Sequence, residues 1–250
     1  MRVLKIGGNE LNDPEFLPTL ASWVAEITGK GESIVIVHGG GNDIAAIQSR
    51  LGLEPKKVDG LRVTDAHSLT IAQMVLSGHV NKQIVTALLT AGVDAVGLSG
   101  VDGRLLTAQK KSHPTVNLGL VGEIVDVRTE LLTSLSQHGV TAVVSPISIG
   151  KDNLTYNVNA DEAASAIALS MQADLLDFIS NVPGVLKDGE VVPQLTADET
   201  EALIEEGIIE GGMVPKVRGA LTAVSKGVPR ARIVNLAGLL QSGGTIFQKA

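Results

Sequence analysis

Val3-Leu4-Lys5-Ile6-Gly7-Gly8 and Ile34-Val35-Ile36-Val37-His38-Gly39-Gly40-Gly41 are the two stretches that decide the fold. Each begins with an apolar run of the length of a buried strand, and each is stopped by glycines. Runs of this kind alternate with helix-like segments to the end of the chain. The pattern predicts an α/β fold, a three-layer sandwich with a mainly parallel central sheet flanked by helices.

The remaining elements follow from the same periodicities. Strands are predicted at Val3–Ile6, Ile34–Val37, Ala95–Leu98, Ala142–Ser145, Leu175–Ile179, Ala231–Val234 and Thr245–Phe247. Helices are predicted at Glu15–Thr28, Asn42–Leu51, Asp65–Leu89, Asp161–Met171, Ala197–Glu206 and Pro215–Gly227, with Asn42 and Asp65 as N-caps. The glycine-rich, alternating sequence between Ser99 and Arg128 predicts a β-hairpin region. We expect a single domain over residues 1–250, whose two lobes, approximately 1–173 and 174–250, meet near Ala173.

Composition narrows the class of protein. Of the 250 residues, 44% are hydrophobic and only 2% aromatic, so Val, Ile, Leu and Ala must build a large core. The absence of cysteine excludes disulfides, thiolate metal sites and cysteine nucleophiles, and it fits a reducing compartment. A net charge of −7 without a basic run disfavours general binding to nucleic acid or anionic membranes. Since the chain passes directly into a strand, with no signal-like or membrane-length apolar stretch, we expect a cytoplasmic protein.

The two glycine stops indicate an anion site. Glycine lets the backbone approach a ligand closely, and exposed N–H groups at a helix start attract anions. Ligands of open α/β sheets bind at the carboxyl ends of strands, where both stops lie. If either glycine segment is considered alone, the alternative to an anion site is that its glycines only allow the chain to turn. The dinucleotide fingerprint Gly-x-Gly-x-x-Gly and the P-loop pattern are both absent, so a phosphate site here must be of another kind.

Two lysines stand out. Lys5 interrupts an otherwise apolar strand, where a lysine is heavily desolvated unless it meets an anion. The alternative is an edge-strand lysine whose ammonium group reaches water. Lys216 lies just inside the helix that follows Gly211–Pro215. The helix dipole disfavours a cation there unless an anion binds at the same end, and an ordinary surface lysine is the alternative.

Further polar residues lie next to predicted strands. Asn157, Asn159 and Asp161 alternate with apolar residues before a helix. Period two directs all three toward one face, where two amides and a carboxylate would converge. A helix cap at Asp161 would account for only one of them. Arg62, within Gly60–Thr64, carries a guanidinium suited to bidentate binding of a carboxylate, although a solvated arginine is also common before a helix.

The sequence lacks the motifs that catalysis at a protein-bound metal or by a nucleophilic serine would require. The five histidines are scattered and contain no pair at metal-binding spacing. Gly97–Gly100 is not a nucleophile elbow, because Gly-x-Ser-x-Gly needs its last glycine one position later. His67 and His79 lie on a predicted helix, where surface or core roles are more common than catalysis.

Six segments, taken in order, resemble the amino-acid kinase family over essentially the whole chain. They are Lys5-Ile6-Gly7-Gly8, Val37-His38-Gly39-Gly40-Gly41, Gly60-Leu61-Arg62-Val63-Thr64, Asn157-Val158-Asn159-Ala160-Asp161, Ser180-Asn181-Val182-Pro183-Gly184-Val185 and Gly212-Met213-Val214-Pro215-Lys216. Each is weak alone, whereas their joint order is specific. They are most similar to the branch that phosphorylates N-acetyl-L-glutamate. The resemblance implies a kinase that transfers the γ-phosphoryl group of ATP, bound with Mg²⁺, to a side-chain carboxylate, giving an acylphosphate in arginine biosynthesis.

The resemblance also implies roles for individual residues. Lys5 and Lys216 would stabilise the transferring phosphoryl group, Asp161 would organise both lysines, and Gly8 would donate a backbone N–H. In the lobe 1–173, the acyl-amino acid would be held by Gly40, Gly41, Arg62 and Asn157, with Asn159 beside them. In the lobe 174–250, the ATP site would be lined by Ser180, Asn181, Val182, Pro183, Gly184, Val185, Ile208, Ile209 and Glu210. No metal site built by the protein itself is implied, because Mg²⁺ arrives with ATP.

Two other functions stay open. Leu98–Arg104 and the turn Ser180–Gly184 also resemble sister enzymes that phosphorylate a carrier-bound aminoadipate in lysine biosynthesis. Gly60–Thr64 and Asn157–Asp161 fit the glutamate branch better, and a negatively charged chain suits an acidic carrier protein poorly. A non-catalytic sensor of a nucleotide or amino acid is the other alternative. The resemblance further implies a homodimer with weak or no arginine feedback, because the chain lacks the extra N-terminal helix of arginine-inhibited hexamers.

Overall fold

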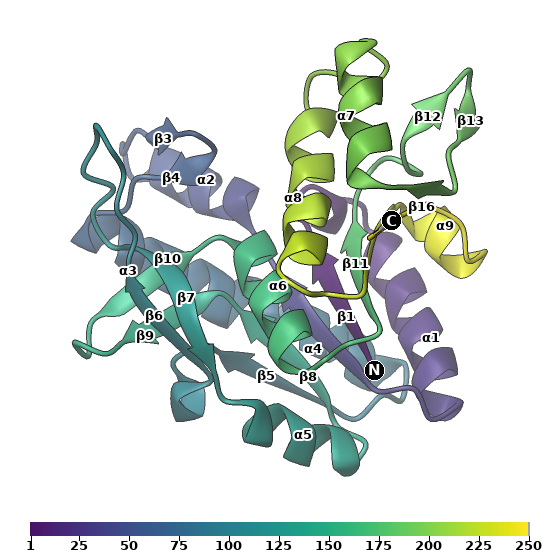
Figure 1. Cartoon of the computed structure of the whole chain (residues 1–250). Helices are drawn as coiled ribbons and strands as arrows, with labels where there is room; N and C mark the ends of the chain where they lie inside the picture. The colour runs from purple at the N-terminus through teal and green to yellow at the C-terminus, as the bar shows by residue number, and fades with distance from the viewer. Residues whose placement is uncertain (250) are drawn as a thin grey trace.

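A mainly parallel sheet forms the middle layer, as predicted, in the computed structural model, which describes residues 1–249. Its strands are Arg2–Ile6 (β1), Ile34–His38 (β2), Ala95–Ser99 (β5), Thr141–Ser145 (β8), Leu175–Ile179 (β11), Gln194–Leu195 (β14), Arg230–Val234 (β15) and Thr245–Gln248 (β16). Over the described residues the sheet has eight strands in the order β14-β16-β15-β11-β1-β2-β8-β5 (Figure 1). Neighbouring strands run parallel, except that β15 and β16 are antiparallel.

Helices cover both faces of the sheet and complete the three layers. They are Phe16–Gly29 (α1), Gly41–Arg50 (α2), Ala66–Gln73 (α3), Asn81–Thr90 (α4), Thr129–Gln137 (α5), Ala160–Ser170 (α6), Ala197–Glu205 (α7), Met213–Ser225 (α8) and Leu236–Leu240 (α9). Helices α5, α6 and α8 pack on one face, whereas α1 and α4 lie on the other (Figure 1). Short 3₁₀ turns occupy Glu10–Asn12 and Asp102–Arg104. Within residues 1–249, none of these helices has the length and apolar character that crossing a membrane requires.

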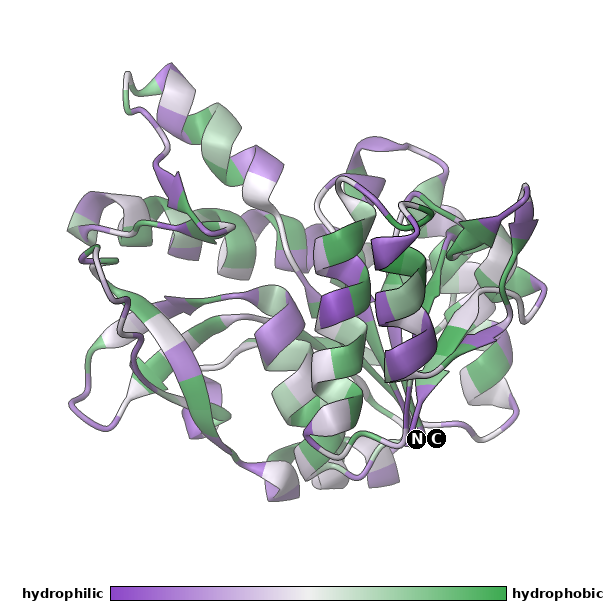
Figure 2. Cartoon of the chain, turned by 45° about the horizontal axis from the view of Figure 1, so that its top comes forward, coloured by the Kyte–Doolittle hydropathy of each residue, from purple (hydrophilic) through white to green (hydrophobic). Residues whose placement is uncertain are grey.

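The core is divided by the sheet into two apolar clusters. Successive residues of β1 alternate between them, since Val3 belongs to one cluster and Leu4 and Ile6 to the other. All five residues of β2 are buried. The continuous apolar run predicted this for Ile34–Val37, whereas the burial of His38 was not predicted. Hydrophobic residues accordingly fill the central strands, whereas the helices alternate hydrophobic and hydrophilic residues along their length (Figure 2).

The hairpin region forms part of a small closed barrel beside the main sheet. Leu106–Lys110 (β6) and Val121–Val127 (β7) are antiparallel, which confirms the predicted hairpin. Ile147–Gly150 (β9) and Thr155–Val158 (β10) close the barrel. The period of two at Asn157–Asp161 indicated strand character near β10, whereas β9 was not predicted. A strand of four residues such as β9 gives too short a pattern to be recognised by itself. Two further hairpins pair Lys57–Val58 (β3) with Leu61–Arg62 (β4), and Leu186–Lys187 (β12) with Glu190–Val191 (β13).

The helix starts confirm one predicted cap and correct another. Asp65 caps α3, and its carboxylate accepts a hydrogen bond of 2.7 Å from the Ser68 N–H. Asn42 is not a cap, because α2 already begins at Gly41 and the cap position is occupied by Gly40. The predicted long helix is continuous from α3 to α4, but Met74–Val80 between them is π-helical. Helices α5 and α9 were not predicted.

Candidate active site

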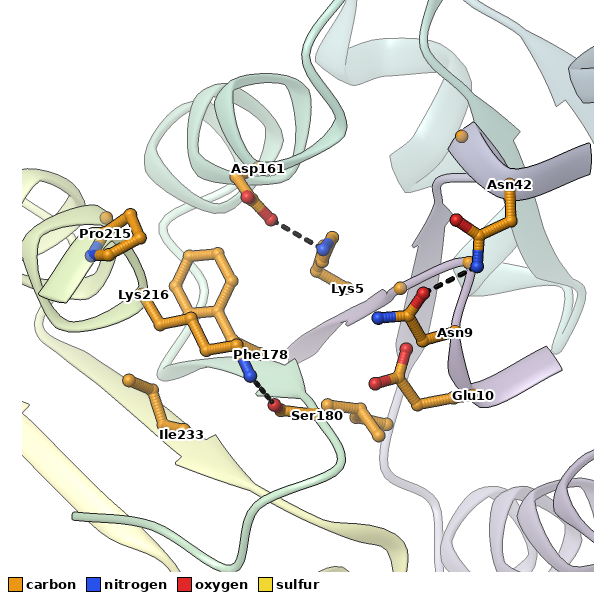
Figure 3. Close-up of a pocket in the computed structure, with 15 residues that line it drawn as sticks. Lys5, Asn9, Glu10, Asn42, Asp161, Phe178, Ser180, Pro215, Lys216 and Ile233 are labelled. Carbon is orange, nitrogen blue, oxygen red and sulfur yellow. Dashed lines mark hydrogen bonds and ion pairs between the residues drawn. The ribbon is translucent and has the colours of Figure 1, made fainter. Parts of the chain in front are cut away.

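The carboxyl ends of three neighbouring strands lie side by side in the sheet. Strand β1 pairs with both β2 and β11 in parallel, so the segments that follow their carboxyl ends lie together. These segments are Gly7-Gly8, Gly39–Gly41 and Ser180-Asn181. A cavity opens between them and the start of α8 (Figure 3). Its polar lining includes Lys5, Gly8, Glu10, Asp161, Ser180 and Lys216.

Lys5 meets the anion that its place in an apolar strand requires. Its Nζ lies 2.9 Å from Oδ1 of Asp161, and the lysine side chain is only 18% exposed. Helix α6 presents this carboxylate from its first turn, because Asn159 caps the helix by accepting hydrogen bonds from the N–H groups of Asp161 and Glu162. The ion pair therefore joins the carboxyl end of strand β1 to the first turn of helix α6 (Figure 3).

Lys216 enters the same cavity from the first turn of α8. Its Nζ donates hydrogen bonds of 2.7 Å to Ser180 Oγ and 3.0 Å to Asn181 Oδ1. Burial lowers the pKa of Lys216, and the positive charge of Lys5 lowers it further, whereas the carboxylates of Glu10 and Asp161 act in the opposite direction. The position of Lys216 in the sequence favoured an ordinary surface lysine, and only the family resemblance implied a role at the site. The structure brings both lysines into one cavity.

The two glycine loops are in direct backbone contact. A Cβ atom added to Gly8 would lie 3.2 Å from both Gly40 Cα and Gly41 N, so a side chain at this position would push the loops apart. The side chains that follow the glycines link the loops as well, since Asn42 Nδ2 donates to Asn9 Oδ1 at 2.6 Å (Figure 3). The predicted convergence of two glycine stops on neighbouring strands is confirmed.

A second cavity adjoins the first and shares Gly41 with it. It is lined by Gly40, Arg62, Asn157 and Asn159, among others. Arg62 is buried and fixed at both ends of its fork, with Nη1 donating to Gln48 Oε1 at 2.5 Å and Nη2 to the Gly41 carbonyl at 2.8 Å. Burial lowers the pKa of the Arg62 guanidinium from its ordinary value. A cation held in this way suits an anionic group of a small molecule.

The three polar residues around α6 do not converge on one face, contrary to the prediction. Asn157 and Asn159 line the second cavity, whereas Asp161 lines the first. The strand period applies only as far as Val158, where β10 ends, and α6 begins at Ala160 and turns Asp161 away. Asn157 donates from Nδ2 to Thr64 Oγ1 at 3.2 Å. The three residues thus bridge the two cavities instead of sharing one.

Of the two segments predicted to line the ATP site, Ser180–Val185 and Ile208–Glu210, only the beginning of the first lies at the first cavity. Ser180 lines the first cavity and Asn181 contacts Lys216. Val182–Gly184 continue as the turn after β11, and the Val185 N–H donates to Thr245 Oγ1 at 2.8 Å. The side chains of Val185 and Ile209 are buried, Ile208 packs against the same core cluster, and Glu210 is exposed. Neither Val182–Val185 nor Ile208–Glu210 lines the two cavities.

Several site residues were not predicted from the sequence. Gln48, which orients Arg62, is a buried polar residue on α2, and no sequence signal distinguishes it from an exposed glutamine. Glu10 lines the first cavity from the turn that follows Gly8. Asn9 and Asn42 could have been suspected, because each directly follows a glycine stop. Over residues 1–249 no group of three or more His, Cys, Asp or Glu side chains is arranged to hold a metal ion.

Comparison with known proteins adds evolutionary relationships to this geometry. Residues 1–235 match the amino acid kinase family. The acetylglutamate kinase of Roseiflexus castenholzii is 51% identical over 245 residues, which cover 98% of this chain and 93% of that protein. The acetylglutamate kinase of Methanopyrus kandleri is 44% identical, with 99% and 100% covered. Among solved structures, smu.665 of Streptococcus mutans is 28% identical with a TM-score of 0.84, covering 100% of this chain and 98% of that one.

Proposed function

The chain belongs to the amino acid kinase family, and on this premise we propose that it is an acetylglutamate kinase. It transfers the γ-phosphoryl group of ATP to the side-chain carboxylate of N-acetyl-L-glutamate. The products are an acylphosphate, N-acetylglutamyl phosphate, and ADP. This reaction belongs to arginine biosynthesis.

One observation carries the proposal. Lys5 and Lys216, from opposite ends of the chain, line one cavity, and that cavity adjoins a second one in which Arg62 is buried. Two ammonium groups suit a transferring phosphoryl group, and a buried guanidinium suits a carboxylate. The glycine shared by the two cavities, Gly41, lies where donor and acceptor would meet.

The chemistry requires positioning rather than proton transfer. A carboxylate is already ionised at neutral pH, so its attack on phosphorus needs no general base. Two anions must instead be brought together in line, and their repulsion must be relieved. We assign the relief to the ammonium groups of Lys5 and Lys216 and to the Gly8 N–H. Asp161 holds Lys5 in place through the 2.9 Å ion pair.

The acceptor is assigned to the second cavity. Arg62 binds the α-carboxylate, and the N–H groups of Gly40 and Gly41 bind the side-chain carboxylate that attacks phosphorus. Asn157 and Asn159 hold the remaining polar groups. This assignment is supported by the lining of the cavity and by the fixed guanidinium of Arg62.

ATP is assigned to the segments after β11 and before α8. Its phosphates extend into the first cavity, with Ser180–Val185 and Ile208–Glu210 along the nucleotide. Mg²⁺ is taken to arrive with ATP, because this ion is usually held by phosphates and one or two carboxylates. The carboxylates of Glu10 and Asp161, which line the cavity, fit such a role. Residues 1–173 then form the acyl-amino-acid lobe and 174–250 the ATP lobe.

A homodimer is part of the same proposal. Strand β5 lies at one end of the sheet, and over residues 1–249 it pairs with no strand other than β8. On the two helical segments that contact β5, Met74–Val80 and α4, Met74 and Leu89 expose 58% and 53% of their surface. Apolar side chains next to an open strand edge favour association of a second copy through this side of the molecule.

A hydroxamate assay tests the proposed reaction, because hydroxylamine traps an acylphosphate. The purified protein is given ATP and Mg²⁺ with N-acetylglutamate, glutamate, aspartate or carrier-bound aminoadipate. Hydroxamate formed with N-acetylglutamate in clear preference to the others supports the proposal. Product only from carrier-bound aminoadipate would identify the sister enzyme of lysine biosynthesis. No product from any acceptor would favour a sensor.

A further inference from the structure

His38 is a buried titratable residue that the proposed transfer does not use. It ends strand β2 directly before Gly39, and none of its surface is exposed. Both ring nitrogens have partners: Nδ1 lies 2.9 Å from the Gly39 carbonyl oxygen, and Nε2 lies 3.2 Å from Asn81 Nδ2. A fully buried polar ring at the entrance of a glycine loop needs a physical explanation.

The partners fix the tautomer of the ring. A carbonyl oxygen only accepts, so Nδ1 must carry the hydrogen and donate it to Gly39. The Asn81 amide is oriented by its surroundings, because Oδ1 accepts from Lys82 Nζ at 2.9 Å, and Nδ2 faces the carbonyl oxygens of Val143 at 2.9 Å and of Leu98 at 3.3 Å. With the hydrogen on Nδ1, a neutral ring presents Nε2 as an acceptor, and the group that faces it at 3.2 Å is the Asn81 Nδ2 donor.

The charge state agrees with this arrangement. Burial lowers the pKa of His38 to about 4; the hydrogen bond to the Gly39 carbonyl acts in the opposite direction, and the nearby Lys82 ammonium group lowers the pKa further. Lys82 reaches the ring region from α4, where its Nζ also donates to the Gly97 carbonyl of β5 at 3.3 Å. A protonated Nε2 would face the N–H of Asn81, donor against donor. The His38 ring is thus neutral, and its Nδ1–H donates to the Gly39 carbonyl oxygen.

Holding the Gly39 carbonyl has a consequence for the next residue. Gly39 O and Gly40 N–H belong to one planar trans peptide, so they point in opposite directions. Because the carbonyl is turned toward the buried ring, the Gly40 N–H is turned away from it. Over residues 1–249, no backbone carbonyl accepts from this N–H, and Gly40 lines the second cavity. A glycine peptide without such a contact has little resistance to flipping.

The π-helical segment Met74–Val80 positions Asn81, which contacts Nε2 of His38. Its last residue is Val80, so Asn81 follows it directly and begins α4 fully buried. The same segment presses against the glycine loop: a Cβ atom on Gly40 would lie 2.8 Å from Leu76 Cδ2 and 3.2 Å from Val80 Cγ2. Such π segments change the direction of side chains within a helix and are frequent at functional sites.

We infer that His38 and Asn81 form a clamp that positions the Gly40 N–H toward the acceptor carboxylate, so that His38 is a positioning residue for binding of the acyl-amino acid. The inference rests on the proposed function, in which Gly40 contacts that carboxylate. The clamp acts on the acceptor and not on ATP, because Lys5, Lys216 and Ser180 make none of the contacts that hold it.

Kinetics of His38→Leu, which removes both nitrogens at similar size, test the clamp. We expect the KM for N-acetylglutamate to rise about tenfold, the effect of one lost orienting hydrogen bond, while the KM for ATP stays within about twofold. His38→Asn places an amide N–H near the position of Nδ1, so it should recover most of the acceptor affinity. His138→Leu, the same change at an exposed histidine of the α5 end, is the matched control and should leave both KM values unchanged.

The tautomer provides a second test that is independent of turnover. In long-range ¹H–¹⁵N spectra of the wild-type protein, the His38 ring, identified by its loss in His38→Asn, should be protonated at Nδ1 only. It should not titrate between about pH 5.5 and about pH 8. This measurement decides the matter even if His38→Leu fails to fold.

The outcomes separate the clamp from the reaction. A wild-type protein that forms no hydroxamate would overturn the proposed function, while the spectra would still support or overturn the clamp. An active wild type overturns the inference in three cases. They are an unchanged acceptor KM in His38→Leu, an equal rise of both KM values that His38→Asn does not reverse, and a ring protonated at Nε2.

Discussion

Lys5 and Lys216 are held by partners of different charge. Lys5 is neutralised by the Asp161 carboxylate, whereas Lys216 is held by the neutral oxygens of Ser180 and Asn181. The charge of Lys216 is therefore the less compensated of the two and the more available to a phosphate. The lowered pKa of Lys216 agrees with an ammonium group in a desolvated site that already contains another cation.

Removing either ammonium group should reduce turnover without unfolding the protein. For Lys5→Ala and Lys216→Ala we expect kcat to fall by ~10²-fold or more, the usual effect of losing a charge contact in the transition state. Hydroxamate kinetics measure the effect, and circular dichroism checks the fold. Lys30→Ala, which removes an exposed lysine paired with Glu26, is the control and should retain full activity. Near-normal turnover in folded Lys216→Ala would contradict the assignment.

The pH profile should carry the signature of Lys216. The residue acts as a cation, so activity should be lost as the pH rises through its pKa. Because burial lowers that pKa, the alkaline decline of kcat should begin below the pH expected for an ordinary lysine, ~10.4. In Lys216→Arg the guanidinium stays charged, and the decline should move to higher pH even if kcat is reduced. Identical alkaline limbs in the two proteins would assign the titration to another group.

Arg62 should control the affinity for the acceptor alone. In Arg62→Lys a single ammonium group cannot maintain the contacts to Gln48 and Gly41 and also bind a carboxylate by two hydrogen bonds. We expect the KM for N-acetylglutamate to rise ~10- to 100-fold, with little change in the KM for ATP. Arg50→Lys, at the exposed end of α2, is the matched control. A parallel rise in both KM values would show that Arg62 acts on the whole site.

Among the elements, the two glycine loops are the most tightly constrained. They follow neighbouring parallel strands, and their backbones touch at Gly8, Gly40 and Gly41. The Asn9–Asn42 hydrogen bond adds a side-chain link across the same contact. The binding sites proposed for ATP and for the acyl-amino acid would therefore share one rigid segment of backbone. A small separation of the two loops should then affect the kinetics with both substrates.

Gly8→Ala tests this coupling. The added methyl group would meet Gly40 and Gly41 backbone atoms at 3.2 Å, which the loops can relieve only by moving apart. We expect kcat/KM to fall ~10²-fold or more for both substrates, because misplacement by about 1 Å is enough for such a loss. Gly29→Ala, at the end of α1 with no atom near the added methyl, should leave kinetics unchanged and slightly raise the melting temperature. A fully active Gly8→Ala would show that the loops are not held rigidly.

At the scale of the whole molecule, the sheet joins both ends of the chain around one site. Strands from the first half, β1 and β2, lie beside β11 and β15 from the second half. The two lysines consequently reach one cavity from helices and strands that are distant in sequence. The sheet ends at β5 on one side, and this open edge is the basis for the proposed dimer.

Introducing charge beside that edge should separate the proposed dimer. We expect light scattering to give twice the chain mass for the wild type and the single chain mass for Met74→Glu combined with Leu89→Glu, since both side chains are exposed on helical segments that contact β5. Leu186→Glu, an exposed leucine on the distant hairpin β12–β13, should leave the mass unchanged. A wild type of single chain mass, or a double variant that stays dimeric, would rule out this interface.

Much of the framework could be predicted because it depends on local sequence. Buried strands are continuous apolar runs, and the glycines after β1 and β2 mark where the strands must stop. Lys5 could be singled out because a lysine in such a run needs an anion. Short strands and caps were harder. The strand β9 is only four residues long, and Asn42 satisfies the sequence rule for a cap although Gly40 takes the position.

The sequence by itself determined that strands alternate with helices, that glycines end two of these strands, and that Lys5 is anomalous within its strand. The family resemblance already implied that Asp161 serves the two lysines, whereas only the tertiary structure decided that Gln48 meets Arg62 and that Asn81 meets His38. The physical reason is that periodicity reports which face of its own element a residue occupies. Partners across the fold depend instead on strand order and on how helices dock, which are set by the burial of the whole core at once.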